Sequence, residues 1–600
     1  MNRRVLLLEP PYKNKYPPMG LMKLATYFRR CNDTIRFYKG DLRTLAATLL
    51  CEDFLSSTHS PSLAPYASHL TDYIRTGKFS CLEAIPNFYN FSRELLIKDY
   101  RRRFTAHDFP QFDIIAITTL FTFCWRETID TINSSKSFCS PSGKILVGGI
   151  AASLVPQEIL RETGITPITG TLNRHGIIDP ENSDIIDSLP LDYSILEETD
   201  YTYPAHDAYF AYTTRGCIRQ CDFCAVPILE PEYRDFLSIS QQIHYIDTHF
   251  GQRKDLLLMD NNVLASPRFD DIIDEIKACG FAKGASYIPP DEYAIAFRNL
   301  TQGLNTRAYI IKILKLYDRL AQRLSGKDAG DFYNYRESHG LLYPESATPD
   351  EIIRADSFFR PMYAKHFRPV KRSRYVDFNQ GIDARLITDE NMKRLAEINI
   401  RPLRIAFDHY EQRDIYTRAV RLAAKWGISD LSNYLLYNFH DKPDDLYMRM
   451  RINVDLCEEL DVKIYSFPMK YHPVRDPEYF RNRDYIGTHW NRKFIRAVQA
   501  VMNSTKGKIG RGVAFFEAAF GSDIHKFHDI LYMPETFIIY REKYSTLAEE
   551  WRGKFYALNE SDMQTAKTII ESNNFGNIGE ISGISAEVRD VLSYYLIERG

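Results

Sequence analysis

Residues 213–224 read TTRGCIRQCDFC, and the interpretation of the whole chain starts from this stretch. Its three cysteines, Cys217, Cys221 and Cys224, have the spacing C-x₃-C-x₂-C. Three thiolates this close in sequence can bind three irons of a [4Fe–4S] cube, which has four positions for cysteine. Because no fourth cysteine lies nearby, one iron stays open to a small molecule, just as a catalytic zinc keeps an open position. The nearest other cysteines are Cys139 and Cys279.

A zinc knuckle or three unrelated cysteines are the alternatives for the triplet. Structural zinc takes four ligands, and no C-x₂₋₄-H partner comes after the triplet. The stretch resembles the cluster loop of radical S-adenosylmethionine (SAM) enzymes, including the aromatic Phe223 before the third cysteine. The resemblance implies that SAM chelates the open iron through its amino and carboxylate groups. One electron, from a donor such as flavodoxin or ferredoxin, then cleaves SAM to methionine and a 5′-deoxyadenosyl radical.

Composition predicts a soluble, cytoplasmic protein of several domains. The chain has 600 residues, and its ten cysteines are too few for a disulfide scaffold, which indicates a reducing compartment. The apolar run before Glu9 has only four residues, Val5 to Leu8, whereas a signal peptide needs roughly 7–15. The longest apolar stretch, residues 114–125, is shorter than the roughly 20 residues of a membrane span. A net charge of −2 gives no basic field that would indicate nucleic acid.

The first 170 residues alternate strands and helices, which predicts a doubly wound parallel sheet of the Rossmann-like class. Residues 42–111 interrupt this pattern and are expected to form a mostly helical insertion. Short apolar runs predict strands at residues 4–8, 34–38, 112–119 and 144–147. Helical spacing predicts helices at residues 20–30, 121–133 and 156–162.

Sheets of this class bind ligands beyond the carboxyl ends of their strands. The region resembles the cobalamin-binding domain that precedes many radical SAM cores, on the motifs P-P…P-M-G-L at residues 10–21 and V-G-G at residues 147–149. No D-x-H-x-x-G motif comes after the first strand, so no histidine is placed as a lower axial cobalt ligand. The alternative is a retained fold that binds no cofactor and only shapes the active site. The resemblance implies cobalamin contacts at Pro10, Pro11, Gly20, Thr118, Gly148 and Gly149.

Residues 205–476 repeat a strand–helix unit six times. Six such units with right-handed crossovers predict an open (β/α)₆ barrel, which is the core of the radical SAM family. Residues 171–204 are expected to be a linker, and residues 477–600 a helical C-terminal domain. The strands are predicted at residues 209–214, 255–259, 374–378, 403–407, 433–439 and 462–467.

Local signals give further expectations about this region. Ser266 and Thr388 are predicted as helix N-caps. Residues 282–372 interrupt the barrel between its second and third strands, and the apolar face of a helix at residues 306–324 is expected to pack on the barrel. In the C-terminal domain, helices are predicted at residues 490–501 and 544–572.

The chemistry of β/α barrels lies at the carboxyl ends of the strands, so the polar residues there are interpreted as one site. Asp260, Asn261 and Asn262 resemble the family's motif for the SAM ammonium, which donates to carboxylate and amide oxygens. Arg385 is a candidate for bidentate pairing with the SAM carboxylate, and Asp408 suits a pair of ribose hydroxyls. The predicted SAM contacts are Phe223, Asp260, Asn261, Asn262, Gln380, Arg385, Asp408, Asn438 and Met469.

Three histidines, His409, His440 and His472, also fall at strand ends. Each is either a hydrogen-bonded structural residue or a proton donor or acceptor for a substrate, since histidine titrates near neutrality. No residue is identified as catalytic, and the substrate is not predicted.

The leading hypothesis is cobalamin-dependent methyl transfer to an unactivated carbon. One alternative is a radical SAM hydrogen abstraction without cobalamin, with the N-terminal domain as a scaffold. Another is a non-catalytic iron–sulfur or cobalamin sensor, against which the polar strand ends argue. A methylthiotransferase would need a second cysteine triad in the N-terminal domain, and no such triad is evident among Cys31, Cys51, Cys81, Cys124 and Cys139.

Overall fold

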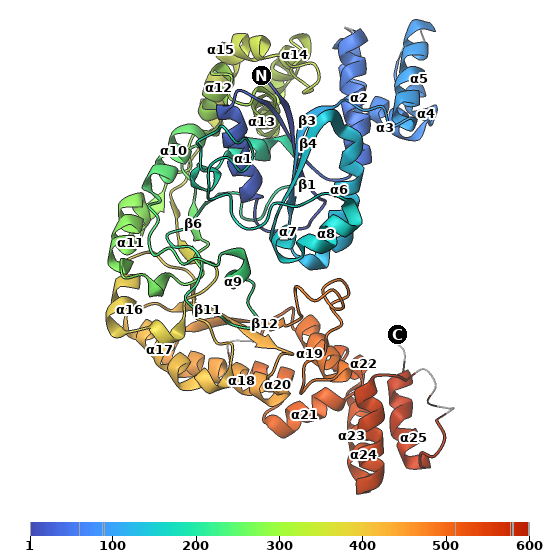
Figure 1. The fold of residues 1–600 in the computed structure, drawn as a ribbon, viewed down its shortest axis with the longest axis vertical. Helices are drawn as coiled ribbons and strands as arrows, with labels where there is room; N and C mark the ends of the chain where they lie inside the picture. Colours follow the sequence, from blue (N-terminus) through green and yellow to red (C-terminus); the bar gives the residue numbers. More distant parts are fainter. Residues whose placement is uncertain are drawn as a thin grey trace.

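Four parallel strands form the sheet at the N-terminal end of the computed structural model, which describes residues 2–58, 61–86, 88, 91–509, 512–575, 578 and 581–597 (Figure 1). They are β1 (Arg4–Glu9), β2 (Thr34–Lys39), β3 (Phe112–Thr119) and β4 (Cys139–Gly149), in the order β2-β1-β3-β4. Every pairing is parallel. The prediction of a parallel sheet from strand–helix alternation is therefore confirmed.

Helices cover both faces of this sheet because its central strands are apolar on both faces. Val5 and Leu7 of β1 pack in one core, together with α1 (Met19–Arg30). Leu6 and Leu8 pack in a second core on the other face, as the two-residue period of a strand requires. That core contains residues of α2 (Leu42–Thr58), α6 (Trp125–Ser135), α7 (Ile150–Leu154) and α8 (Pro156–Thr163).

The predicted helical insertion is confirmed within the described residues. It extends to one side of the sheet (Figure 1) and contains α2, α3 (Ala67–Thr76), α4 (Ser80–Glu83) and α5 (Phe91–Thr105).

The segment predicted as a linker is packed against the rest of the protein. Residues 193–198 form a 3₁₀ helix, and Tyr193 and Ile195 are buried in the main core. The backbone N–H of Asp192 donates to the carbonyl of Met22 in α1 over 3.2 Å. This segment therefore joins the N-terminal sheet firmly to the strand–helix units of residues 205–476.

Strands occur at all six positions predicted for residues 205–476. β5 (Ala208–Ala211), β6 (Asp255–Leu258) and β9 (Val376–Phe378) form one parallel sheet. β10 (Leu403–Arg404), β11 (Asp430–Tyr437) and β12 (Lys463–Lys470) form another. Parallel bridges, Val376 to Ile400 and Ile382 to Ile405, connect the two sheets. The carboxyl ends of all six strands therefore lie in succession along a common edge.

The crossover helices of the strand–helix units are α10 (Ser240–Phe250), α11 (Phe269–Ile276), α16 (Asp389–Leu395), α17 (Arg413–Lys425) and α18 (Pro443–Leu460). The predicted N-cap at Thr388 is confirmed, because its Oγ1 accepts from the N–H of Asn391 over 3.2 Å. The predicted N-cap at Ser266 is wrong. Its hydroxyl donates to the carbonyl of Asp235 over 2.5 Å, and the helix begins only at Phe269.

The insertion between β6 and β9 has a core of its own. A short antiparallel pair, β7 (Ser286–Tyr287) and β8 (Arg372–Ser373), closes its base. The apolar stripe of α13 packs with Phe332 and Phe359 in this core, so the expectation that it packs on the barrel is wrong. The helices are α12 (Glu292–Thr301), α13 (Thr306–Ala321), α14 (Gly326–Ser338) and α15 (Pro349–His366).

The C-terminal part is helical, as predicted. The single helix predicted at residues 544–572 is divided at Leu558, whose backbone is extended, and Asn559 caps the second half by accepting from the N–H of Asp562 over 3.0 Å. The helices are α19 (Arg492–Ser504), α20 (Val513–Phe520), α21 (Ile524–Tyr532), α22 (Glu535–Ile539), α23 (Ser545–Ala557), α24 (Glu560–Ser572) and α25 (Ala586–Ser593).

A search of the described residues for a helix long and apolar enough to cross a membrane finds none.

Candidate functional site

The loop that carries the three cysteines runs from the end of β5 to the short helix α9 (Val226–Leu229). Gly216 precedes the first cysteine with φ +70°, and a Cβ there would lie 2.5 Å from the carbonyl oxygen of Glu232. Only glycine fits such a position. Arg215 anchors the loop by pairing with Glu230 at 2.6 Å and with Asp187 at 2.7 Å. The TRG residues of the stretch therefore fix the start of the loop.

Hydrogen-bond donors surround the thiol groups, all three of which are half-buried. The N–H of Arg219 donates to Cys217 Sγ and the N–H of Val226 to Cys224 Sγ, each over 3.4 Å. Burial raises the pKa of Cys221 and of Cys224, and the neighbouring cysteines raise it further, which places the three side chains within reach of one another. A bound metal centre lowers the pKa of these thiols instead, because a coordinating thiol is deprotonated outright.

The three sulfurs are not gathered around one point. Within the described residues, no three His, Cys, Asp or Glu side chains lie close enough together to hold a single ion. A cube binds each thiolate at a different iron, so its ligands stay farther apart than those of one ion.

Asp260 supports the strand end that leads to the cysteine loop, and its contact with the SAM ammonium stays a prediction. Its side chain is 1% exposed and lies under the cysteine loop. Its carboxylate accepts from the backbone N–H groups and hydroxyls of both Thr213 and Thr214, with hydroxyl distances of 2.7 Å. Burial raises the pKa of Asp260, and these donors counteract the rise. These bonds, most of them to Oδ1, fix the strand end that leads to Cys217.

Asn262 keeps a side-chain acceptor without a partner. It is 1% exposed, and its Nδ2 donates to Cys217 Sγ over 3.5 Å. Its Oδ1 is buried and has no hydrogen-bond partner. A buried acceptor without a donor is costly and indicates a missing partner. An ammonium group beside Cys217 would supply one. Asn261 instead donates to Glu230 over 3.0 Å, which ties it to the far end of the cysteine loop.

Asp383, which was not predicted, organises the arginines around the second cysteine. It accepts from Arg385 Nε over 2.6 Å and from Arg219 Nε, within the cysteine loop, over 3.0 Å. The charge of Arg385 also lowers the pKa of the Cys221 thiol, so the guanidinium lies near it. The predicted Arg385 therefore lies at the cysteine triplet, and its position depends on a carboxylate two residues before it.

Asp408 comes after β10 and keeps a free carboxylate. No described residue donates a hydrogen bond to it, and burial raises its pKa. The buried Arg449 holds the strand end by donating to the carbonyl of Asp408 over 2.7 Å and to that of Leu436 over 2.7 Å. Asp408 also acts electrostatically on Cys221 and Cys224, so it faces the cysteine triplet.

Three other predicted SAM contacts have different surroundings: Asn438 is occupied by structural hydrogen bonds, and Gln380 and Met469 are exposed. Asn438 is fully buried, and its side chain donates to the carbonyls of Tyr471 and Tyr485, each over 3.0 Å, and accepts from the N–H of Gly487. These bonds make it a structural tie. Gln380 is exposed and makes no contact that connects it to the triplet. Met469 is exposed on the edge strand β12.

The aromatic rings of this region connect the cysteine loop to the N-terminal sheet. Phe223 packs edge-on against His409 and Phe439, with centroids 5.9 and 6.0 Å away. Phe439 in turn packs on Tyr471, the residue after β12, at 4.6 Å. His472, the next residue, reaches Phe123, which lies beyond the end of β3, at 6.3 Å.

Most of the residues predicted to contact cobalamin lie at or just beyond the carboxyl edge of the N-terminal sheet. Thr118 pairs with Gly148 across β3 and β4, and β1 and β3 are neighbours, so Pro10 and Pro11 lie beyond the same edge. The chain order reverses between β1 and β3, and such a switch point is where open parallel sheets bind ligands. Gly20 is exposed in the first turn of α1, the helix that follows β1, and a Cβ added there would have nothing within 4 Å.

Gly148 and Gly149 both lie at this edge, but they differ in the space that a side chain would find there. Gly149 has φ +110°, and a Cβ there would lie 2.3 Å from the carbonyl oxygen of Thr119. Its lack of a side chain is therefore explained by strand packing. Gly148 has only the carbonyl of Ile168 within 4 Å of an added Cβ, at 3.8 Å. Beside it, Phe121 and Phe123 stack at 5.1 Å and are 46% and 39% exposed. An open glycine and exposed rings fit a large, partly apolar ligand.

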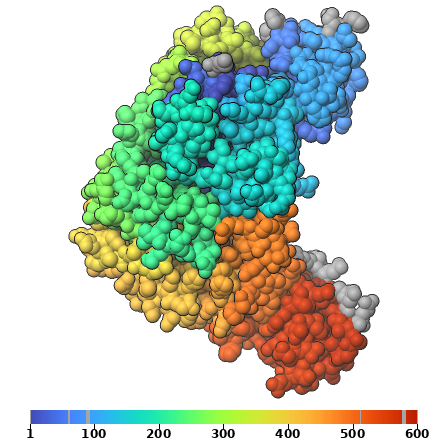
Figure 2. Space-filling model, in the orientation of Figure 1, coloured from blue at the N-terminus to red at the C-terminus, as the bar shows by residue number. Residues whose placement is uncertain are grey.

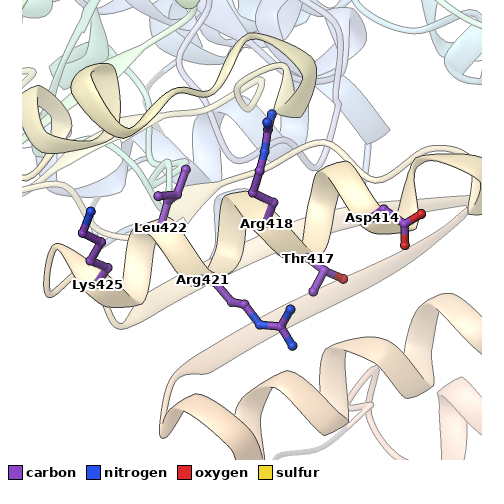
Figure 3. Close-up of a pocket in the computed structure, with 6 residues that line it drawn as sticks. All are labelled: Asp414, Thr417, Arg418, Arg421, Leu422 and Lys425. Carbon is purple, nitrogen blue, oxygen red and sulfur yellow. The ribbon is translucent and has the colours of Figure 1, made fainter.

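A pocket of about 370 Å³ lies on the outer face of α17, apart from the cysteine loop (Figure 3). Its charged side chains already have partners: Arg421 pairs with Glu459 and Lys425 with Asp389. We therefore assign it no role. It is lined by Asp414, Thr417, Arg418, Arg421, Leu422 and Lys425.

The sequence analysis did not identify the residues that position the site through hydrogen bonds without belonging to it. Asp383 and Arg449 act through hydrogen bonds to groups far away in the chain, which a local motif does not reveal. Phe121 and Phe123 could have been found, because they come directly after a predicted strand end, where ligands bind.

No protein-family model and no curated protein matches this chain. Among solved structures, one match is the radical SAM methyltransferase TsrM from Kitasatospora setae with cobalamin and a [4Fe–4S] cluster bound, at 13% identity and a TM-score of 0.38, covering 78% of this chain and 75% of that one. Another is the cobalamin-dependent SAM radical enzyme OxsB with aqua-cobalamin bound, at 12% identity and a TM-score of 0.37, covering 99% and 75%. Likenesses this distant carry no argument about the chain.

Proposed function

We propose that this chain is a radical SAM enzyme that holds a [4Fe–4S] cluster with Cys217, Cys221 and Cys224. The observation that carries the proposal is the placement of the cysteine loop at the carboxyl end of the first of six parallel strands. There it meets the unpartnered Oδ1 of Asn262 and the carboxylate of Asp408. In this proposal residues 205–476 are the family's (β/α)₆ barrel, and residues 477–600 a helical C-terminal domain.

The residues at the strand ends each fit one part of SAM. Asn262 Oδ1 accepts from the ammonium, and its Nδ2 stays on Cys217 Sγ. Arg385, held by Asp383, offers its remaining N–H groups to the carboxylate. Asp408 accepts from the ribose hydroxyls, and the ring of Phe223 borders the site. When bound, the cluster and SAM supply a 5′-deoxyadenosyl radical, for which an electron donor such as flavodoxin or ferredoxin is needed.

We further propose that residues 1–170 bind cobalamin and that the reaction is methyl transfer to an unactivated carbon. The switch point between β1 and β3, the open Gly148 and the exposed Phe121 and Phe123 support this site. Cobalamin and a [4Fe–4S] cluster are also named for the TsrM structure, although that likeness is too weak to support the proposal.

Incubation of the anaerobically reconstituted, reduced protein with SAM tests the proposal. We expect 5′-deoxyadenosine and methionine to form, because Asn262, Arg385 and Asp408 place SAM at the open iron. The products are measured by liquid chromatography and mass spectrometry. A protein that binds the cluster and SAM but never cleaves SAM would be a sensor instead, and the enzyme proposal would then be wrong.

Cobalamin uptake is tested by Gly148→Trp. The indole would fill open space at the sheet edge, so we expect stoichiometric cobalamin binding to fall at least tenfold while the cluster and the SAM cleavage activity remain. Absorbance of the desalted protein measures uptake. The matched control is Gly330→Trp, since Gly330 also has open space around it, on α14 of the insertion. If the wild type takes up no cobalamin yet cleaves SAM, the N-terminal domain is a scaffold and the cobalamin-independent reaction replaces the proposed one.

A further inference from the structure

Two cations at the end of β12 lack a counter-ion. Lys470 is the last residue of β12, and its Nζ donates to the carbonyl of Arg483 over 2.8 Å. The guanidinium of Arg483 lies 4.5 Å from the ring centroid of Phe123, in the N-terminal part. Within the described chain neither cation forms an ion pair with a carboxylate. The acid that acts on Lys470 is Asp484, which is exposed and unpaired with it.

A buried imidazole lies close enough to both cations to feel their charge. His472 is 8% exposed, and its Nε2 is buried without a hydrogen-bond partner. Burial, followed by the charges of Arg483 and Lys470, lowers the pKa of His472 to about 4. The ring is therefore neutral near pH 7. Neutral imidazole has one N–H to donate, and a buried polar atom left unpaired costs stability. An anion would give the His472 side chain its missing partner, and both cations would also attract that anion.

The group formed by Lys470, His472 and Arg483 lies where the N-terminal part meets the strand ends. Tyr471, beside His472, continues the β11 pairing by donating its N–H to the carbonyl of Tyr437 over 2.8 Å, and it packs on Phe439. The same segment is fixed to the N-terminal part farther along, where Arg481 pairs with Glu162 at 2.5 Å. Figure 2 shows this orange segment in contact with the teal surface of residues near 150.

We propose that Lys470, His472 and Arg483 form an oxyanion-binding site beside Phe123. The ligand group is a phosphate or a carboxylate, because both offer several acceptor oxygens to an ammonium, a guanidinium and an imidazole N–H. Because the site lies between the cysteine loop and the N-terminal sheet, the phosphate or carboxylate can belong to either of two molecules. It belongs either to the substrate or, resting on the proposed function, to the nucleotide phosphate of cobalamin.

Inorganic phosphate is the first probe, added to the full-length protein labelled with ¹³C in its histidines. The His472 signal is assigned by its loss in His472→Gln. We expect phosphate to shift this signal and to raise its titration midpoint from about 4, because an anion offsets the two cations. In Lys470→Met and Arg483→Met, phosphate affinity should fall about tenfold or more, the loss of one charge-assisted hydrogen bond.

The matched control is Lys463→Met, which removes an exposed lysine from the opposite end of the same strand. It should bind phosphate like the wild type. The proposal is overturned if phosphate leaves the His472 signal unmoved in the wild type, or if it shifts that signal equally in the control and in Arg483→Met.

Cobalamin and cobinamide, which lacks the nucleotide phosphate, distinguish the sources. If Arg483→Met weakens binding of cobalamin but not of cobinamide, the site holds the nucleotide phosphate. If it affects neither while phosphate binding is lost, the site holds an anionic substrate. Failure of both corrinoids to bind the wild type contradicts the cobalamin proposal only, because the phosphate titration is read independently.

Discussion

Replacement of Cys217, Cys221 and Cys224 together by alanine is expected to remove the reconstituted cluster completely. The wild type should hold about four irons per chain, and the triple variant none above the level of a blank. The reason is that no other cysteine lies on the loop, and each thiolate binds a different iron. Iron and sulfide analysis and the EPR spectrum of the reduced protein measure the loss.

The control keeps the triplet and removes the two nearest other cysteines, Cys139 and Cys279. Cys139 begins β4 of the N-terminal sheet, and Cys279 lies beyond α11 with its Sγ 3.8 Å from Ser240 Oγ. The double variant should retain full iron content. Unchanged iron and EPR signal in the triple variant would contradict the cluster assignment, and with it the proposed function.

The sequence predicted the strands well because each is a short apolar run between polar turns. β3 has the predicted bounds, and β1 and β2 extend one residue beyond theirs. Parallel pairing was predictable from the alternation with helices. β5 is shorter than predicted, since the amides of Thr213 and Thr214 bond to Asp260 instead of to a neighbouring strand.

The site was predicted in part. The cysteine spacing and the polar residues after each strand identified which loops meet, because parallel strands end at one edge. Which atoms stay free could not be predicted, since it depends on partners distant in sequence. Asn438 looks like a ligand residue but is saturated by Tyr471, Tyr485 and Gly487, whereas Asn262 keeps a buried acceptor open.

Asp260→Ala is expected to destabilise the protein and to prevent cluster assembly, which differs from the loss of SAM affinity that its motif alone suggests. The variant leaves two backbone N–H groups and two hydroxyls of Thr213 and Thr214 buried without their acceptor. Unsatisfied buried donors cost about 1–3 kcal/mol each. We expect a net loss of about 3 kcal/mol in the free energy of unfolding, since water can enter part of the space. Thermal denaturation of the apoprotein and iron content after reconstitution measure both effects.

Arg385→Ala distinguishes this role from a direct SAM contact. Arg385 is exposed and pairs with Asp383, so its loss should leave stability and iron content near wild type. It should weaken SAM binding on the order of tenfold to a hundredfold, for a charge-assisted bond of about 1.5–3 kcal/mol. The SAM-induced change in the EPR spectrum of the reduced cluster reports that affinity. If Asp260→Ala instead keeps its cluster and its stability and loses only the SAM-induced change, its carboxylate contacts SAM, and the interpretation of Asp260 as the support of the cysteine loop is wrong.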